Sequence, residues 1–145
     1  MVVSRAAVDD VSAFFSSALK LGFPIEKVIP ANAYGFDDEA MMADNNSSGF
    51  NYRAIAGSSV TSLHASGLAF DVNPRLNPYI RYPSRNSAIV RPPGATRDVE
   101  IPGTLHVDHP LVSLMRAVGW EWGGDWKPES GRTDYQHFQR RLQGI

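Results

Sequence analysis

The sequence predicts an α+β fold in which helices flank a small antiparallel sheet. Two segments carry apolar residues at helical spacing and end at a glycine, whereas several shorter segments alternate between apolar and polar residues as strands do. Short strands mixed with two or three helices are typical of an α+β arrangement. The 145 residues contain neither an internal repeat nor a linker, so we expect one domain, spanning 1–145, around one hydrophobic core.

The first helix is expected over residues 4–20, where apolar residues recur at helical spacing. Gly22 and Pro24 follow this segment, and both residue types are typical of the end of a helix. Residues 25–29, IEKVI, predict a short strand that Pro30 ends.

A second helix and two strands are expected next. Residues 37–44, DDEAMMAD, begin with Asp37, a favourable N-terminal cap, and carry further acids in the first turn. Residues 50–56 alternate as a strand does. Residues 68–73 predict another strand with two different faces. One face carries Leu68, Phe70 and Val72, and the other carries Ala69, Asp71 and Asn73.

The C-terminal half is expected to hold a long loop, one helix and two short strands. Residues 74–104 are rich in proline and arginine, which is typical of a loop or arm. A helix is predicted over 109–119, because Pro110 suits its first turn and Gly119 its end. The remaining elements are a strand at 120–122, a loop at 123–133 and a last strand at 134–139.

Composition excludes several classes of protein. The formal net charge is −1, and no aromatic residues alternate with the arginines, so we expect no nucleic-acid partner. No apolar run approaches the roughly 18 residues of a membrane span, so we expect no membrane insertion. The first residues, MVVSRAAVDD, lack the apolar core of a signal peptide. Because cysteine is absent, any metal must be held by His, Asp or Glu.

The four histidines differ in their context. His106 and His109 lie in HVDH directly before Pro110, where Asp108 can cap the helix, so we interpret this segment as structural. The HExxH signature of helix-borne zinc sites is absent.

His64, Asp71 and His137 form a more informative set. Two imidazoles and a carboxylate suit a tetrahedral zinc ion whose fourth position is left to water, which is the arrangement of a catalytic site. Asp134, three residues before His137, could then act as the general base. The alternative is a hydrogen-bonded structural pair of histidine and aspartate, and spacing alone leaves both interpretations open.

Three segments resemble one family of enzymes. SLHASGLAFD (62–71) matches the SxHxxGxAxD signature of the zinc peptidases that cut bacterial cell-wall peptides, the D-alanyl-D-alanine carboxypeptidase and L-alanyl-D-glutamate peptidase group (peptidase family M15). WGGDW…DYQHFQ is similar to the second motif of that group, in which an acid lies three residues before the last histidine. GFNYRAIAG (49–57) is similar to the segment that supplies a substrate-facing arginine. These blocks follow the family order from about residue 34 to residue 139.

The resemblance implies a fold of the Hedgehog and D,D-peptidase type, with one zinc ion per chain. It implies His64, Asp71 and His137 as the zinc ligands and Asp134 as the general base. It further implies Arg53 as the cation that holds a substrate carbonyl or carboxylate while charge develops in the transition state.

Two further residues are expected to bind substrate, Ser62 and Trp126. A serine before a turn more often serves as a cap, and a cap role for Ser62 is the competing interpretation. Trp120 and Trp122 are expected in the core. Asp125 is expected to brace its loop, with orientation of a zinc-bound imidazole as the alternative.

The chain departs from the family pattern near the second motif. Many relatives carry glutamate in place of Asp134 and tryptophans in place of Tyr135 and Gln136, which leaves substrate contacts at the last two positions undefined. Several arginines in the long loop could meet a substrate carboxylate or an anionic wall polymer, although a solvated loop face is the ordinary interpretation. These are Arg75, Arg81, Arg85, Arg91 and Arg97.

We therefore expect a zinc peptidase that acts on peptidoglycan stem peptides. The compact chain, the missing signal peptide and the WGGDW block favour a monomeric L-alanyl-D-glutamate endopeptidase, of the kind that phages encode and release from the host cytoplasm. A D-alanyl-D-alanine carboxypeptidase with the same site is the close alternative. A zinc-containing binding module of the Hedgehog type is the alternative from another class, and the presence of both Asp134 and Arg53 favours catalysis over it.

Overall fold

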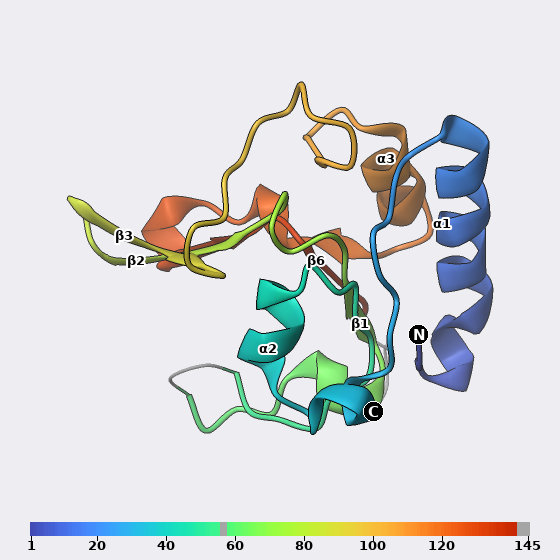
Figure 1. The fold of residues 1–145 in the computed structure, drawn as a ribbon, viewed down its shortest axis with the longest axis horizontal. Coiled ribbons are helices and arrows are strands. Elements are labelled where there is room, and N and C mark those ends of the chain that lie inside the picture. The colour runs from blue at the N-terminus through green and yellow to red at the C-terminus, as the bar shows by residue number, and fades with distance from the viewer. Residues whose placement is uncertain (56–57, 142–145) are drawn as a thin grey trace.

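The computed structural model describes residues 1–55 and 58–141 (Figure 1). The helices are α1 (Val8–Leu21), α2 (Asp38–Ala43) and α3 (Pro110–Ala117). The strands are β1 (Ala69–Asp71), β2 (Tyr79–Ser84), β3 (Ser87–Arg91), β4 (Glu121–Trp122), β5 (Arg132–Asp134) and β6 (His137–Gln139). Short 3₁₀ turns, among them Leu63–Ser66 and Gly123–Asp125, lie between these elements.

The strands form two small antiparallel sheets. One sheet has the order β1-β6-β4, and the other has the order β3-β2-β5. Small antiparallel sheets combined with helices confirm the predicted α+β fold.

The β1-β6-β4 sheet has one apolar face, and that face carries the core. Phe70 of β1 is paired with Phe138 of β6, and their rings stack 5.1 Å apart. Phe14 of α1 meets both rings edge-on, at 5.1 and 5.5 Å. Each of the three side chains is fully buried, which stabilises the fold by roughly 1.5–3 kcal/mol per side chain. The packing therefore fixes the position of the sheet and of its opposite, polar face.

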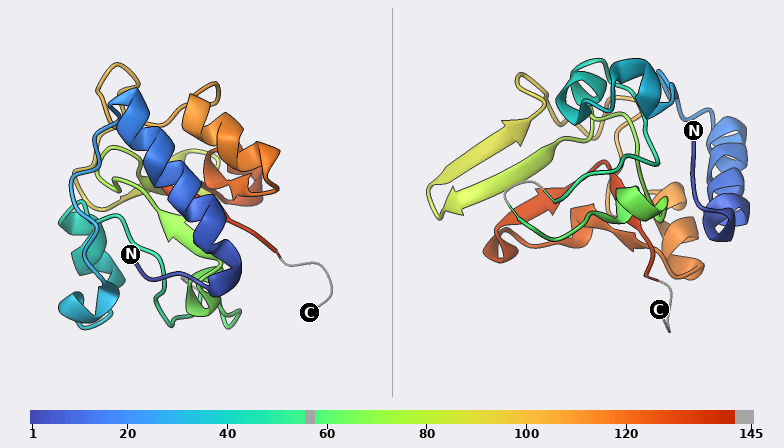
Figure 2. Two further views of the ribbon diagram at one scale, coloured as in Figure 1. Left: turned by 90° about the vertical axis from the view of Figure 1, so that its right-hand side faces the viewer. Right: turned by 90° about the horizontal axis from the view of Figure 1, so that it is seen from below.

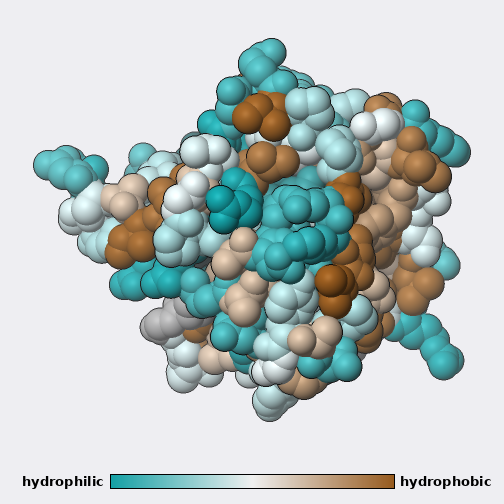
Figure 3. All heavy atoms as spheres, viewed as in Figure 1, coloured by the Kyte–Doolittle hydropathy of each residue, from teal (hydrophilic) through white to brown (hydrophobic). Residues whose placement is uncertain are grey.

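Two of the helices and the β2–β3 hairpin lie at opposite ends of the molecule. Helices α1 and α3 lie side by side, and the hairpin extends away from them on the other side of the sheets (Figures 1 and 2). Hydrophilic residues cover the middle of the face seen in Figure 3, with apolar residues scattered between them. Within residues 1–55 and 58–141, no helix has the length and apolar character needed to cross a membrane.

The helices lie close to their predicted positions, with one corrected cap. Gly22 ends α1 in the left-handed conformation, at φ 65°, and the Asp37 carboxylate accepts a hydrogen bond from the Ala40 amide at the start of α2. Asp108 does not cap α3. His109 does so instead, because its Nδ1 accepts a hydrogen bond from the Leu111 amide at 3.2 Å.

Two predicted strands are absent from the described residues. In 25–29 only Lys27 forms a bridge, with Asn46, because the Asn46 side chain takes both backbone groups of Ile29 that a strand neighbour would use. In 50–55 only Ala54 forms a bridge, with Thr61. Residue 56, the end of that predicted strand, lies outside the described residues.

Two further predictions on the strands are corrected. The segment 74–104 is not one loop, because it contains the β2–β3 hairpin. The segment 134–139 is not one strand. Asp134 ends β5, whereas His137 begins β6, and the two strands belong to different sheets.

Candidate metal centre

Asp71 and His137 lie opposite each other on neighbouring antiparallel strands. Asp71 of β1 is paired with His137 of β6, and the next pair along is Phe70 with Phe138. Because side chains alternate across a strand, burial of the two phenylalanines in the core directs Asp71 and His137 to the opposite face. The same periodicity that builds the core therefore brings a carboxylate and an imidazole together.

His64 comes from the 3₁₀ turn that precedes β1. The Ser62 hydroxyl accepts a hydrogen bond from the His64 amide at 3.3 Å and so starts this turn, as the cap interpretation predicts. Gly67 ends the turn at φ 67°, and a Cβ there would lie 2.5 Å from the Ser4 nitrogen. Only glycine fits both the conformation and the close backbone approach.

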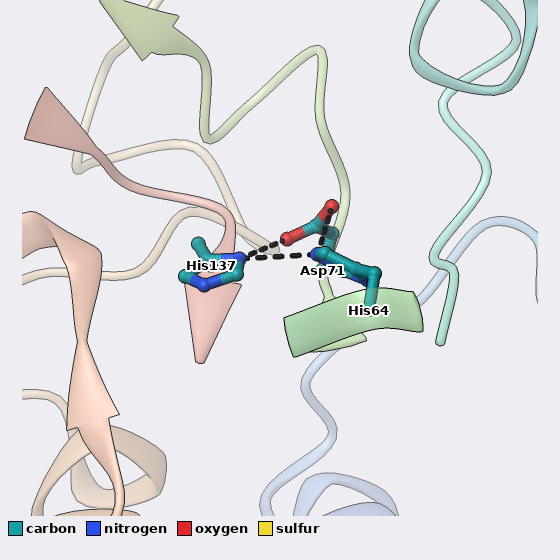
Figure 4. Close-up of side chains that lie close together, drawn as sticks. All are labelled: His64, Asp71 and His137. Atoms are coloured by element: carbon teal, nitrogen blue, oxygen red, sulfur yellow. Dashed lines mark hydrogen bonds and ion pairs between the residues drawn. The ribbon is translucent and has the colours of Figure 1, made fainter. Parts of the chain in front are cut away.

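The three side chains converge on one point (Figure 4). His64 Nε2 lies 3.2 Å from His137 Nδ1 and 3.2 Å from an Asp71 oxygen. His137 Nδ1 lies 3.0 Å from the other Asp71 oxygen. All three residues are buried, with exposed fractions of 2%, 5% and 7% for His64, Asp71 and His137.

The outward nitrogens of both imidazoles face hydrogen-bond acceptors. His64 Nδ1 lies 2.7 Å from the Gly49 carbonyl oxygen, which can only accept, so this nitrogen carries the proton. His137 Nε2 lies 3.1 Å from Gln139 Oε1 and donates to it. The Gln139 amide is held in this orientation because its nitrogen donates to Glu121 at 2.6 Å. Both inward nitrogens are therefore left as lone pairs.

This donor set fits a divalent metal ion. Two lone-pair nitrogens and a carboxylate that face one another at about hydrogen-bond distance repel unless a cation or a proton lies between them. Burial alone would raise the pKa of Asp71, but the imidazoles beside it hold the pKa below its usual value. Burial alone would lower the pKa of His137, but the hydrogen bond and charge of Asp71 raise it. The cluster therefore attracts positive charge.

A cleft of about 260 Å³ opens over these three residues. It is also lined by Asp134, Arg53, Ser62 and Trp126, so every residue that the sequence marked for the site borders one cleft. Their catalytic and binding roles stay predictions, whereas their proximity is a feature of the fold.

Asp134 combines partial exposure with one deeply buried oxygen. Its Oδ1 has no hydrogen-bond partner among the described residues. Burial raises the pKa of Asp134 to about 7, and the charge of Asp71 adds to this, against the opposing effect of His137. A carboxylate that exchanges its proton near neutral pH suits acid–base chemistry.

Arg53 is held at the cleft by helix α2. Its Nη2 lies 3.0 Å from Asp38 of that helix, and its buried Nε has no hydrogen-bond partner among the described residues. Burial raises the pKa of Asp38, against the opposing charge of Arg53. A guanidinium group has five N–H donors, and the contact with Asp38 uses only part of them, so the others are left for an incoming oxygen.

The three tryptophans lie where the sequence predicts them, two in the core and one at the cleft. Trp120 and Trp122 are buried in the core, whereas Trp126 is half-buried at the cleft, with its ring 5.5 Å from the His137 ring. Asp125 does not orient an imidazole, because it forms a salt bridge with Arg116 on the surface.

The arginines of residues 74–104 do not form one cluster. Arg97 stacks on Tyr135 at 3.6 Å, away from the metal centre, whereas Arg81 and Arg91 line the cleft.

Sequence reasoning missed the residues that hold the imidazoles. Gln139 lies two positions after His137, and this spacing on a strand puts both side chains on one face. That signal was present in the sequence. The pairing of Glu121 with Gln139 was not, because it depends on the register between β4 and β6.

An α+β fold with a buried His–Asp–His donor set in a cleft defines a class of protein, those with a candidate site for a divalent metal ion. A sequence model of the D-alanyl-D-alanine carboxypeptidase family, within peptidase family M15, matches residues 56–140. The match covers more than half of the chain, which therefore belongs to this family and is a hydrolase of the zinc-type group that acts on peptidoglycan. Neither a curated protein nor a solved structure gave a significant match.

Proposed function

We propose that this chain is a zinc-dependent endopeptidase that cleaves the L-alanyl-D-glutamate bond of peptidoglycan stem peptides. The observation that carries the proposal is the convergence of His64, Asp71 and His137 in the cleft that Asp134 and Arg53 also line. Family membership supports the peptidase chemistry. The choice of this bond rests on the WGGDW block.

His64, Asp71 and His137 would hold the zinc ion through their inward nitrogens and the Asp71 carboxylate. When bound, zinc polarises a substrate carbonyl and lowers the pKa of water, which supplies a nucleophile near neutral pH. The Gly49 carbonyl and Gln139 each hold a proton on the outward nitrogen of an imidazole, which turns the inward nitrogen toward the zinc ion.

Asp134 would act as the general base and then as the general acid. Its carboxylate takes a proton from the attacking water and returns it to the leaving amine. Burial disfavours the charged form of this carboxyl, which suits a group that both accepts and returns a proton.

Arg53 would stabilise the oxygen on which negative charge develops. Its salt bridge to Asp38 fixes the guanidinium group before substrate binds, so little reorganisation is needed in the transition state. Ser62 and Trp126 would contact the substrate backbone and side chains from the walls of the cleft.

The second candidate is a D-alanyl-D-alanine carboxypeptidase that uses the same residues. The description of the matching family favours it. A zinc-containing module that binds without turnover is less well supported, because such a module needs neither Asp134 nor Arg53.

The test is a digest of purified peptidoglycan with the zinc-loaded protein and with Asp134→Asn, followed by mass spectrometry of the new ends. We expect L-alanine carboxyl ends and D-glutamate amino ends from the unmutated protein alone. Release of free D-alanine would instead establish the carboxypeptidase. No products from either protein, with zinc bound stoichiometrically, would refute the enzyme.

A further inference from the structure

One face of the β3-β2-β5 sheet forms a wall of the cleft. Alternate residues of these strands share a face, and the register places those of neighbouring strands side by side. The cleft-lining positions are Tyr79 and Arg81 of β2, Ile89 and Arg91 of β3, and Arg132 and Asp134 of β5.

Two arginines of this wall lie directly opposite each other. Arg81 of β2 is paired with Arg132 of β5. Like charges at such a position destabilise a sheet. Arg91 is neutralised by Glu39 at 2.8 Å, whereas no acidic group of residues 1–55 and 58–141 lies within 4.0 Å of Arg81 or Arg132. A locally unfavourable pair at the edge of a cleft is typical of a functional site.

The Arg132 guanidinium is held in place by an aromatic ring. Its Cζ lies 5.0 Å from the Trp126 ring, which is a cation–π arrangement. Trp126 lies in turn 5.5 Å from the His137 ring. These two separations place the Arg132 guanidinium no more than about 10.5 Å from the centre of the His137 ring.

The position of Asp134 indicates which side of the scissile bond this wall contacts. A base that returns its proton to the leaving amine must lie within hydrogen-bond reach of that nitrogen. Arg132 is two residues from Asp134 on the same face of β5, roughly 6.7 Å along the strand. The residue on the amine side of the bond therefore lies closest to the arginine pair. A carboxylate on that residue is the complementary ligand, because guanidinium groups bind carboxylates through paired hydrogen bonds.

We propose that Arg81 and Arg132 form a carboxylate subsite for an acidic residue on the amine side of the scissile bond. The inference rests on the proposed function, since it takes Asp134 as the group that serves the leaving amine. In the L-alanyl-D-glutamate bond the amine-side residue is D-glutamate, which keeps one free carboxylate. The subsite binds this carboxylate and so fixes which peptide bond lies over the metal centre.

The test measures binding without turnover, in the zinc-loaded Asp134→Asn background. Two probes are compared by isothermal titration calorimetry. One is a stem peptide whose D-glutamate keeps its free carboxylate, and the other is the same peptide with that carboxylate converted to an amide. Both carry an amidated C-terminus, so that the D-glutamate carboxylate is the only group that differs. We expect the background protein to bind the carboxylate peptide about tenfold more tightly, the effect of one charge-assisted contact.

Substitutions Arg81→Gln and Arg132→Gln, each added to that background, are expected to reduce the preference to less than about threefold. Arg81→Lys should retain part of it, because the charge is kept while the paired geometry is lost. Arg85→Gln is the matched control. It removes the same charge from the same hairpin at an exposed position that does not line the cleft.

The inference is overturned if the background protein binds both peptides equally, if neither glutamine variant changes the preference, or if Arg85→Gln lowers it as much. Zinc stoichiometry and circular dichroism of each variant separate loss of the subsite from loss of the fold. Failure of the proposed function would be detected in a different experiment, from the products of the peptidoglycan digest. Free D-alanine without new D-glutamate amino ends would refute the endopeptidase, and the binding comparison would still decide the subsite.

Discussion

Replacing Asp134 by asparagine should stabilise the metal-free protein while it removes activity. The buried Oδ1 of Asp134 has no partner among the described residues, and burial raises the pKa of this carboxyl to about 7. The unfolded chain releases the proton near pH 3.8, whereas the folded protein keeps it until about pH 7. Over this interval the folded state binds more protons, so this group lowers the free energy of unfolding as the pH rises. Asparagine has no such titration.

The magnitude follows from the pKa difference. A pKa that moves from 3.8 to about 7 corresponds to roughly 4 kcal/mol at pH 8, at ~1.36 kcal/mol per pKa unit. Two effects reduce this figure. Asp134 is partly exposed, and its negative charge also helps to raise the pKa of His137, a contribution that asparagine would lose. We therefore expect Asp134→Asn to gain about 2 kcal/mol at pH 8 and close to nothing at pH 4.

The assay is urea unfolding of both proteins with a metal chelator present, at several pH values between 4 and 8. Asp108→Asn, an exposed substitution before α3, is the control and should show the same pH dependence as the unmutated protein. Hydrolysis by Asp134→Asn should fall by about 10²- to 10⁴-fold with zinc present. If Asp134→Asn and the unmutated protein were equally stable at all pH values, the claim that burial of the ionised Asp134 carboxylate destabilises the metal-free protein would be refuted.

Three further predictions concern the residue that orients His137, the arginine expected to bind the substrate oxygen, and the core. Gln139→Leu removes the acceptor for His137 Nε2 and should weaken zinc binding about 10- to 100-fold in a chelator competition, and unchanged zinc binding would contradict this orienting role of Gln139. Arg53→Ala should lower kcat/KM by about 10²- to 10³-fold with zinc affinity unchanged, and an equal loss of zinc would contradict its placement on the substrate side. Phe14→Ala should lower the free energy of unfolding by about 3–5 kcal/mol, measured in urea, because the ring is fully buried against Phe70 and Phe138.

Much of the site could be predicted because it depends on local periodicity. The alternation of residues 68–73 predicts that Asp71 points away from the core. In the structure, burial of Phe70 in the core turns Asp71 to the opposite face of β1. The cap role of Ser62 also follows from its place before a turn. These features need only neighbouring residues, so the sequence contains all the information that determines them.

The parts that could not be predicted depend on long-range pairing. The β2–β3 hairpin has an exposed, arginine-rich sequence that resembles a loop, and β2 is stabilised by pairing with β5 about 50 residues later. The pairing of Arg81 with Arg132 therefore has no local signal. His109 rather than Asp108 caps α3 because the helix begins at Pro110, and the cap is the residue directly before the first helical residue.

The register between β1 and β6 makes the candidate metal centre a reporter of correct folding. A slip of one residue would put His137 opposite Phe70. Either the imidazole would then point into the aromatic core or a phenyl ring would point into the cleft. The ligand set exists in one alignment of the two strands, and that same alignment buries Phe70 and Phe138. The amount of zinc bound during refolding is therefore expected to follow the proportion of chains whose strands have aligned natively, and a misaligned chain would be inert toward both metal and cell wall.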